Sequence, residues 1–199
     1  MGPMPLPGFN SEMSAIPIQM SNVIAALERD HANIAKLLEL LESEILAIEV
    51  GKTPDYPLLQ DIMRYMTHYP DRFHHPKEDL IFARVLKREP GARDDVEDLL
   101  EEHISIGLAG QEFNKLLRKS AVDSVDVREQ LGTLGFAYIR ALREHMLKEE
   151  RKLFALAKVI FTKEDWQIID EEVDAIEDPL FGAMIADEYQ RLYRLITDG

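Results

Sequence analysis

Four long stretches of helical hydrophobic spacing, joined by short turns, constrain this chain most. Apolar side chains recur every three or four residues over about 22–50, 57–88, 94–119 and 126–161, the spacing that lines one face of an α-helix. Glycine, proline and polar residues fill the short gaps, and short connections make consecutive helices antiparallel neighbours. The sequence therefore predicts an all-α fold, an up-down-up-down four-helix bundle with a C-terminal helical extension.

The bundle is predicted to span residues 21–160, with a segment on either side. Residues 1–20 hold four of the ten prolines and no Lys or Arg, so we expect an irregular N-terminal arm rather than a secretion signal. Residues 161–199 contain two shorter helical patterns, one starting near Thr162 and one after Pro179. Their apolar residues need cover, which either the bundle or a dimer or partner surface would provide.

Charge and cysteine content exclude several classes of function. The formal net charge of -14 disfavours nucleic acids and anionic membranes as partners, because both attract basic surfaces. With no cysteine, the chain cannot build disulfides or thiolate metal sites, so any metal must be held by His, Asp or Glu. No stretch is long and apolar enough to predict a membrane span, and we expect a cytoplasmic protein.

Two strings in the sequence place a histidine four residues before a glutamate: His74 to Glu78 and His145 to Glu149. Residues four apart share one face of a helix, so each string can aim an imidazole and a carboxylate at one ion or at a close pair. Acidic runs on helices are otherwise solvated surface, which is what we expect of Glu150.

Helix heights connect these strings with histidines on the other two helices. His31 and His103 each lie about ten residues from the start of their helices. The two strings lie about nine to fourteen residues from the ends of theirs. With a rise of ~1.5 Å per residue, all of these residues lie at a similar height along the bundle, in one slab. This slab lies ~15 to 20 Å from the end of the bundle that the helices share. A lone histidine on an apolar face is usually a core residue, but this joint placement favours metal ligands.

The positions of residues around and along the second helix add His75 to the candidate metal ligands and leave His68 outside them. Glu78 falls ~40° round the axis from His74 and His75 falls ~100° round, so the carboxylate lies between the two imidazoles. His68 lies ~10 Å further along the axis, out of reach unless the kink or break that Pro70 predicts brings it closer. The predicted metal ligands are His31, His74, His75, Glu78, His103, His145 and Glu149.

This ligand set favours certain metals. Imidazole and carboxylate suit iron, manganese and zinc, whereas calcium takes oxygen ligands only. A carboxylate from each of two helices favours a dinuclear centre, because two cations repel and need anions between them.

The order of these residues resembles a known family. The sequence resembles the hemerythrin-like HHE cation-binding domain over residues 22–158. The residues that carry the resemblance are His31, the string from His74 to Glu78, His103 and the string from His145 to Glu149. The resemblance implies a non-haem centre of two Fe ions, bridged by both glutamates and an oxo or hydroxo group, with the five histidines as terminal ligands; Mn or Zn would suit the same residues.

One position departs from the marine-worm oxygen carriers of that family. Those proteins have a second histidine on the third helix, where this chain has Gly107, so simple oxygen carriage is not implied. The chain looks more like the bacterial branch, which is associated with oxygen or nitric oxide binding, iron homeostasis and repair of damaged iron centres.

Three functions are compatible with these patterns. The leading hypothesis is reversible binding of a diatomic gas, oxygen or nitric oxide, for sensing, storage or delivery. A histidine-rich centre donates less charge than a carboxylate-rich oxidase site and should disfavour O–O cleavage, which favours a binding protein over an enzyme. The alternatives are a di-iron enzyme or iron donor in nitric oxide or peroxide stress or in iron-centre repair, and a metal-stabilised bundle whose residues 162–199 form a homodimer or partner interface.

Overall fold

The structure is a computed structural model that describes residues 22–119, 125–173 and 178–197, and these residues form helices and turns without strands. The N-terminal arm expected over residues 1–20 lies outside this part of the chain. Among the described helices, none combines the length and the apolar character needed to cross a bilayer.

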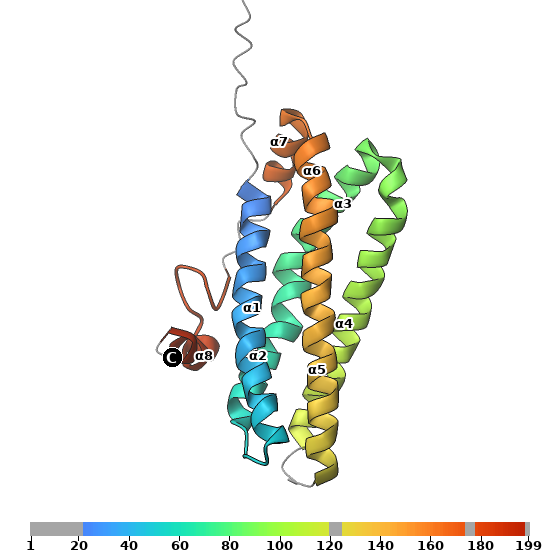
Figure 1. Ribbon diagram of the computed structural model, residues 1–199. Helices are drawn as coiled ribbons and strands as arrows, with labels where there is room; N and C mark the ends of the chain where they lie inside the picture. The colour runs from blue at the N-terminus through green and yellow to red at the C-terminus, as the bar shows by residue number, and fades with distance from the viewer. Residues whose placement is uncertain (1–21, 120–124, 174–177, 198–199) are drawn as a thin grey trace, which may run out of the picture.

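Four antiparallel helical rods form the bundle (Figure 1). The first and third rods are single α-helices, whereas the second and fourth each consist of two α-helices joined by a π-helical turn. In chain order the rods are α1 (Asn22–Glu49); α2 (Tyr56–Tyr69), η1 (Pro70–His74) and α3 (His75–Arg88); α4 (Arg93–Lys119); and α5 (Val125–Lys148), η3 (Glu149–Phe154) and α6 (Ala155–Ile160). The predicted all-α four-helix bundle is confirmed.

Local signals explain how the chain turns between rods. Gly51 has a φ of 77°, a left-handed conformation that side chains disfavour, and it ends the first rod. Asp55 then caps α2 by accepting a hydrogen bond from the backbone N–H of Leu58 at 2.9 Å. At the other end of the bundle, the short 3-10 turn η2 (Pro90–Ala92) leads directly into α4.

Pro70 opens the π-helical turn η1 in the second rod. Proline has no N–H to donate to the helical ladder, so the sequence predicted a kink or break at this point. The chain makes one wider turn and continues as α3, so the predicted interruption is confirmed without a break in the rod. The second π-helical turn, η3, contains no proline, and no sequence signal predicted it.

Buried apolar side chains form two clusters that lie on either side of a polar layer. Along α1, Leu27 belongs to one cluster and Ile34 to the other, with His31 between them. In the fourth rod, Leu142 and Leu153 belong to different clusters in the same way. The polar layer is therefore closed by apolar packing toward both ends of the bundle.

The first part of the C-terminal extension is a short helix, α7 (Lys163–Glu172), which packs against α1 and α3. Thr162 and Asp165 form a capping box at its start, where the sequence predicted one. Trp166 of α7 is buried in the apolar cluster that includes Leu27.

The last helix begins later than predicted. We expected a helix from just after Pro179, but residues 179–189 form turns, including the 3-10 turn η4 (Asp187–Tyr189), and α8 covers only Gln190–Thr197. One turn does form, closed by the Gly182 N–H and the Asp178 carbonyl at 2.8 Å, but glycine propagates a helix poorly. The chain instead buries Leu180 against the bundle, so tertiary packing, rather than the local helical pattern, determines its path here.

Candidate metal centre

All seven residues predicted as metal ligands lie in the polar layer. They come from all four rods: α1 and α4 carry one each, η1 and α3 carry three, and the junction of α5 with η3 carries two. Their donor atoms form three overlapping groups in which all atoms lie within 4.8 Å of one another. The groups are His31, His74, Glu78 and Glu149; His75, Glu78 and His103; and His103, His145 and Glu149.

His68 lies outside this cluster, as predicted. Its side chain is exposed, and Nδ1 lies 2.7 Å from the backbone carbonyl of Arg64 and 3.2 Å from the hydroxyl of Thr67. The π-helical turn does not bring it to the other histidines.

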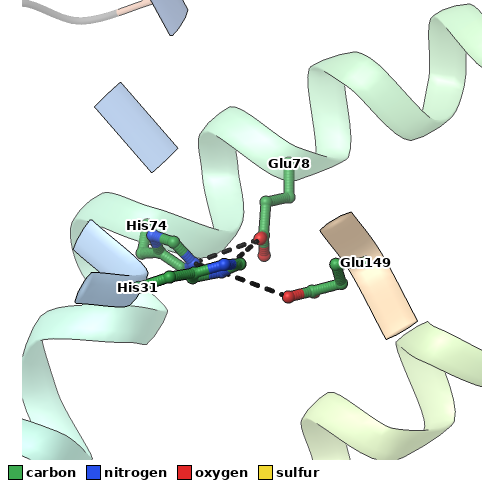
Figure 2. A group of neighbouring side chains, drawn as sticks. All are labelled: His31, His74, Glu78 and Glu149. Atoms are coloured by element: carbon green, nitrogen blue, oxygen red, sulfur yellow. Dashed lines mark hydrogen bonds and ion pairs between the residues drawn. The ribbon is translucent and has the colours of Figure 1, made fainter. Parts of the chain in front are cut away.

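The two oxygens of Glu78 face different halves of the cluster. Oε1 lies 3.1 Å from Nε2 of His74 and 3.7 Å from Nε2 of His31, whereas Oε2 lies 3.4 Å from Nε2 of His103. Figure 2 shows the first half, with both imidazoles turned toward the Glu78 carboxylate. This side chain is fully buried.

Glu149 divides its oxygens in the same way. Oε2 lies 3.3 Å from Nε2 of His31 (Figure 2), whereas Oε1 lies 3.0 Å from Nε2 of His103 and 2.9 Å from Nε2 of His145. The two carboxylates therefore lie between a pair of imidazoles from α1 and η1 and a pair from α4 and α5. This is the arrangement in which two carboxylates could bridge two cations.

The surroundings of three carboxylate oxygens in the cluster indicate whether the site fits a metal. Both oxygens of Glu78, and Oε2 of Glu149, are buried and have no hydrogen-bond partner. Buried carboxylate oxygens without partners are strongly unfavourable. In addition, Nε2 of His31 lies 3.1 Å from Nε2 of His74, which directs two nitrogens at one point. A cation at that point would satisfy both nitrogens and the oxygens, so the donor set fits a metal centre.

Four further carboxylates hold the outer nitrogens of these rings. Each accepts from an Nδ1 atom, so the neutral ring keeps its Nε2 lone pair for the centre of the cluster. The pairs are Glu150 with His31 at 2.9 Å, Asp30 with His74 at 3.2 Å, Asp71 with His75 at 3.2 Å and Glu102 with His145 at 2.9 Å.

Lysines neutralise two of these outer carboxylates. Lys77 donates to Asp30 at 3.3 Å, and Lys148 is ion-paired with Glu102. Lys148 and His145 lower the pKa of Glu102 against the opposing effect of its partial burial. Glu102 therefore stays ionised and can accept the Nδ1–H of a neutral imidazole.

The inner carboxylates attract protons to the histidines in the metal-free form of the protein. Burial lowers the pKa of His31, but the nearby carboxylates of Glu149 and Glu78 outweigh it and raise this pKa to about 10. Glu78 and Asp30 outweigh burial in the same way at His74, and Glu149 and Glu78 do so at His103, so that both pKa values rise to about 9. At neutral pH a metal must therefore displace protons from these rings, so metal affinity should fall as the pH falls.

His75 behaves differently from its neighbours. Burial and the nearby His103 lower its pKa to about 3, so the ring is neutral at physiological pH. Its ring stacks on that of His103 with 4.0 Å between centroids. A neutral imidazole at this place can bind a cation without first losing a proton.

Both π-helical turns contain or adjoin residues of the cluster. η1 ends at His74, and η3 begins at Glu149. A π-helical turn rotates the residues after it relative to those before it, and such turns are frequent at functional sites. In each rod the turn lies beside the histidine–glutamate string.

Comparison with known families agrees with this geometry. Residues 22–157 match the model of the hemerythrin HHE cation-binding domain, a span that covers all four rods and all seven clustered residues. The chain belongs to this family. A hemerythrin domain of this kind binds metal cations, typically iron. No curated protein and no solved structure matches the chain well enough to add a closer relative.

Sequence reasoning missed the four outer carboxylates of the hemerythrin domain. We expected Glu150 to be solvated surface; its side chain is 39% exposed, but its carboxylate also contacts His31, which the sequence did not indicate. A signal was present: Asp30, Glu102 and Glu150 each adjoin a clustered residue in the sequence, but each contacts a ring on another rod. That partner depends on how the rods pack, which spacing within one helix does not reveal.

Proposed function

We propose that this chain binds two iron ions between its four rods and that the dinuclear centre binds a diatomic gas, oxygen or nitric oxide, reversibly for sensing, storage or delivery. The observation that carries the proposal is the division of the Glu78 and Glu149 oxygens between two pairs of imidazoles. It supports two cation positions rather than one.

The number of donors at each position supports gas binding. The half of the cluster with His31 and His74 offers two nitrogens and two carboxylate oxygens, fewer than the six donors that iron accommodates. Iron bound there would supply an open coordination position and the electrons that a diatomic gas requires. The surrounding residues hold the imidazoles in place and exclude bulk water, since both apolar clusters close the layer.

The proportion of nitrogen to oxygen donors supports binding over turnover. Five imidazoles and only two inner carboxylates give a centre with little anionic charge, which should disfavour cleavage of an O–O bond. A cytoplasmic location, and a partner or homodimer contact through the C-terminal extension, stay predictions beside this proposal.

The test is a spectroscopic titration of the purified protein after anaerobic loading with iron. We expect an absorption spectrum that changes on adding oxygen or nitric oxide and returns when the gas is removed. A colourless protein that holds a single zinc ion would overturn the proposal. Repeated consumption of nitric oxide or peroxide in the presence of a reductant would overturn the binding function in favour of a di-iron enzyme.

A further inference from the structure

The outer face of α4 carries three large apolar side chains that are exposed to solvent. This helix packs against α2 and α5 and lies at one edge of the bundle in the view of Figure 1. Leu100, Ile104 and Leu108 follow one another at intervals of four residues and are 38%, 66% and 61% exposed. No other helix among the described residues has three such residues in succession. Single exposed leucines are ordinary, but a contiguous row indicates a contact surface.

Ile104 and Leu108 belong to a longer row of exposed residues on α4. Starting at Asp94, alternating steps of three and four residues lead to Arg118, and every residue reached in this way is exposed. This spacing of seven residues per two turns is the one at which two helices stay in contact along their length. The row spans ~36 Å, which is long enough for a helix–helix interface.

The row is acidic at its start and basic at its end. Asp94 and Glu97 are its first two residues, and Lys115 and Arg118 are its last two. Glu97 also lies 3.4 Å from Arg93 on the same helix, but an exposed ion pair of this kind contributes little, so Glu97 can pair with another cation. Opposite charges at the two ends make this face complementary to a second copy of itself that runs in the opposite direction.

One register of two antiparallel copies matches the whole row. When Ile104 of each copy lies opposite Leu108 of the other, the apolar residues form the centre of the contact. The same register places the acidic residues of each copy opposite the basic residues of the other, in the pairs Glu97 with Lys115 and Asp94 with Arg118. A parallel pair would instead place acidic residues opposite acidic ones. The antiparallel contact obeys two-fold symmetry, as most homodimers do.

The residues that flank the apolar pair are small. In this register Ser105 of one copy faces Gly107 of the other, and small side chains let two helices approach closely. A Cβ atom at Gly107 would meet no other atom within 4 Å. Close packing inside the chain therefore does not account for this glycine, which is unfavourable within a helix relative to alanine.

We propose that two copies of this chain form an antiparallel dimer through the outer face of α4, with Ile104 and Leu108 at the centre and ion pairs at both ends. The inference goes beyond the proposed metal and gas chemistry and does not depend on it. It also differs from a contact through the C-terminal extension, because Leu180 and Leu192 of that extension are buried against the bundle.

The dimer should be weak and should form only as the protein concentration rises. Its apolar centre is small beside the interfaces of permanent dimers, and the net charge of -14 on each copy causes a general repulsion between the two. We expect a Kd on the order of 1 to 100 µM. The ion pairs at the ends contribute mainly to the choice of partner and register.

The first experiment compares Ile104→Glu with Val159→Glu in the full chain by sedimentation velocity over a concentration series that brackets this Kd. Val159 of α6 is 83% exposed and lies outside the row, so its variant adds the same charge at another place. We expect Ile104→Glu to raise the Kd at least about tenfold and Val159→Glu to leave it nearly unchanged. Metal content and melting temperature are measured for both variants, and Ile104→Ser provides a milder change if Ile104→Glu folds poorly.

The second experiment tests the register by exchanging charges. Glu97→Lys alone and Lys115→Glu alone each place like charges opposite one another at both ends of the antiparallel contact, so each should weaken the dimer. The double variant restores both pairs in reversed order, and its net charge equals that of the unaltered protein. Its Kd should therefore return close to the original value.

The outcomes decide between this dimer and other ways of covering the α4 face. A protein that stays monomeric throughout the series, or a dimer that Ile104→Glu does not weaken, would overturn the proposal. A monomer whose melting temperature falls with Ile104→Glu but not with Val159→Glu would also overturn it, because the same chain would then cover this face. A double variant that dimerises no better than the single variants would show that the antiparallel register is wrong.

Discussion

Four of the five imidazoles of the cluster are held by a carboxylate on their outer side. His145 is representative: Nε2 lies 2.9 Å from Glu149 inside the layer, and Nδ1 lies 2.9 Å from Glu102 outside it. The outer contact fixes which nitrogen carries the proton and orients the ring, as in other histidine metal sites. A carboxylate that never touches the metal should therefore influence how tightly the metal is held.

Replacing Glu102 tests this effect, with Glu101 as its control. Glu102→Ala removes the acceptor for Nδ1 of His145, whereas Glu101 on the same helix is exposed. We expect Glu102→Ala to weaken metal binding by about 10- to 100-fold, and Glu101→Ala to leave it nearly unchanged. Competition with a chromophoric chelator measures both, and equal affinities would show that the outer carboxylate has no such effect.

The histidines themselves offer a second matched pair. His103 faces both inner carboxylates, whereas His68 contacts only its own helix. His103→Ala should lower metal content and melting temperature together; a hundredfold loss of affinity in excess metal corresponds to ~2.7 kcal/mol of unfolding free energy. His68→Ala should change both much less. Elemental analysis and calorimetry measure metal content and melting temperature, and similar losses in the two variants would refute the assignment of His103 as a metal ligand.

At the residue scale the sequence predicted the inner side chains better than the outer ones. His31 and His103 could be placed because helical rise converts position in the sequence into height. Glu102 and Glu150 could not, because an acidic residue on a helix is usually solvated, and its contact with a ring of another rod is settled only by packing. The apolar periodicity therefore located the layer but not the outer contacts within it.

At the element scale, local signals explain most helix boundaries. Pro70 and the capping box at Thr162 both act where the sequence placed them. The π-helical turn η3 and the late start of α8 were not predictable, because neither has a distinctive residue at its start. Burial of Leu180 determines the path before α8, and that burial is tertiary.

Asp165 joins α7 to the bundle and makes a pH-dependent contribution to stability. Its buried carboxylate is ion-paired with Arg84 and Arg88 of α3 and accepts the backbone N–H of Thr162. Burial alone would raise the pKa of Asp165, but the hydrogen bonds from Arg88 and Thr162 outweigh it and hold this pKa at about 2.

Asp165→Asn should lower the free energy of unfolding by ~1 to 3 kcal/mol at neutral pH. Because the folded-state pKa lies below the ordinary value of 3.8, this contribution is complete above that value and is lost as the pH falls through about 2. The difference between the variant and the unaltered protein should therefore shrink on acidification. Urea unfolding at a series of pH values measures it; a difference that does not change with pH would contradict the ion-pair account.

At the scale of the whole molecule, the C-terminal extension completes the bundle. Tyr65 of α2 is buried, donates a hydrogen bond to Asp178 at 2.8 Å and has edge contacts with Phe181 and Tyr189. Leu192 of α8 is buried in the same apolar cluster. Figure 1 shows α8 beside the rods, away from the end that carries α7.

Two leucines of α8 test whether the extension stays on the bundle. Leu192 is 0% exposed and Leu195 is 40% exposed. Leu192→Ala should cost ~2 to 5 kcal/mol of unfolding free energy, and Leu195→Ala should change it by about 0.5 kcal/mol or less. Denaturant unfolding measures both. If both substitutions have small effects and the protein is a stable dimer, the extension serves as a partner surface instead.

The central claim is that Glu78 and Glu149 lie between two cations, and metal stoichiometry tests it most directly. Elemental analysis of freshly purified protein, repeated after anaerobic reconstitution with ferrous iron, gives the number of metal ions per chain. The account predicts two iron ions per chain, because each carboxylate directs one oxygen to each half of the cluster. A reconstituted protein that holds no more than one metal ion per chain would contradict it.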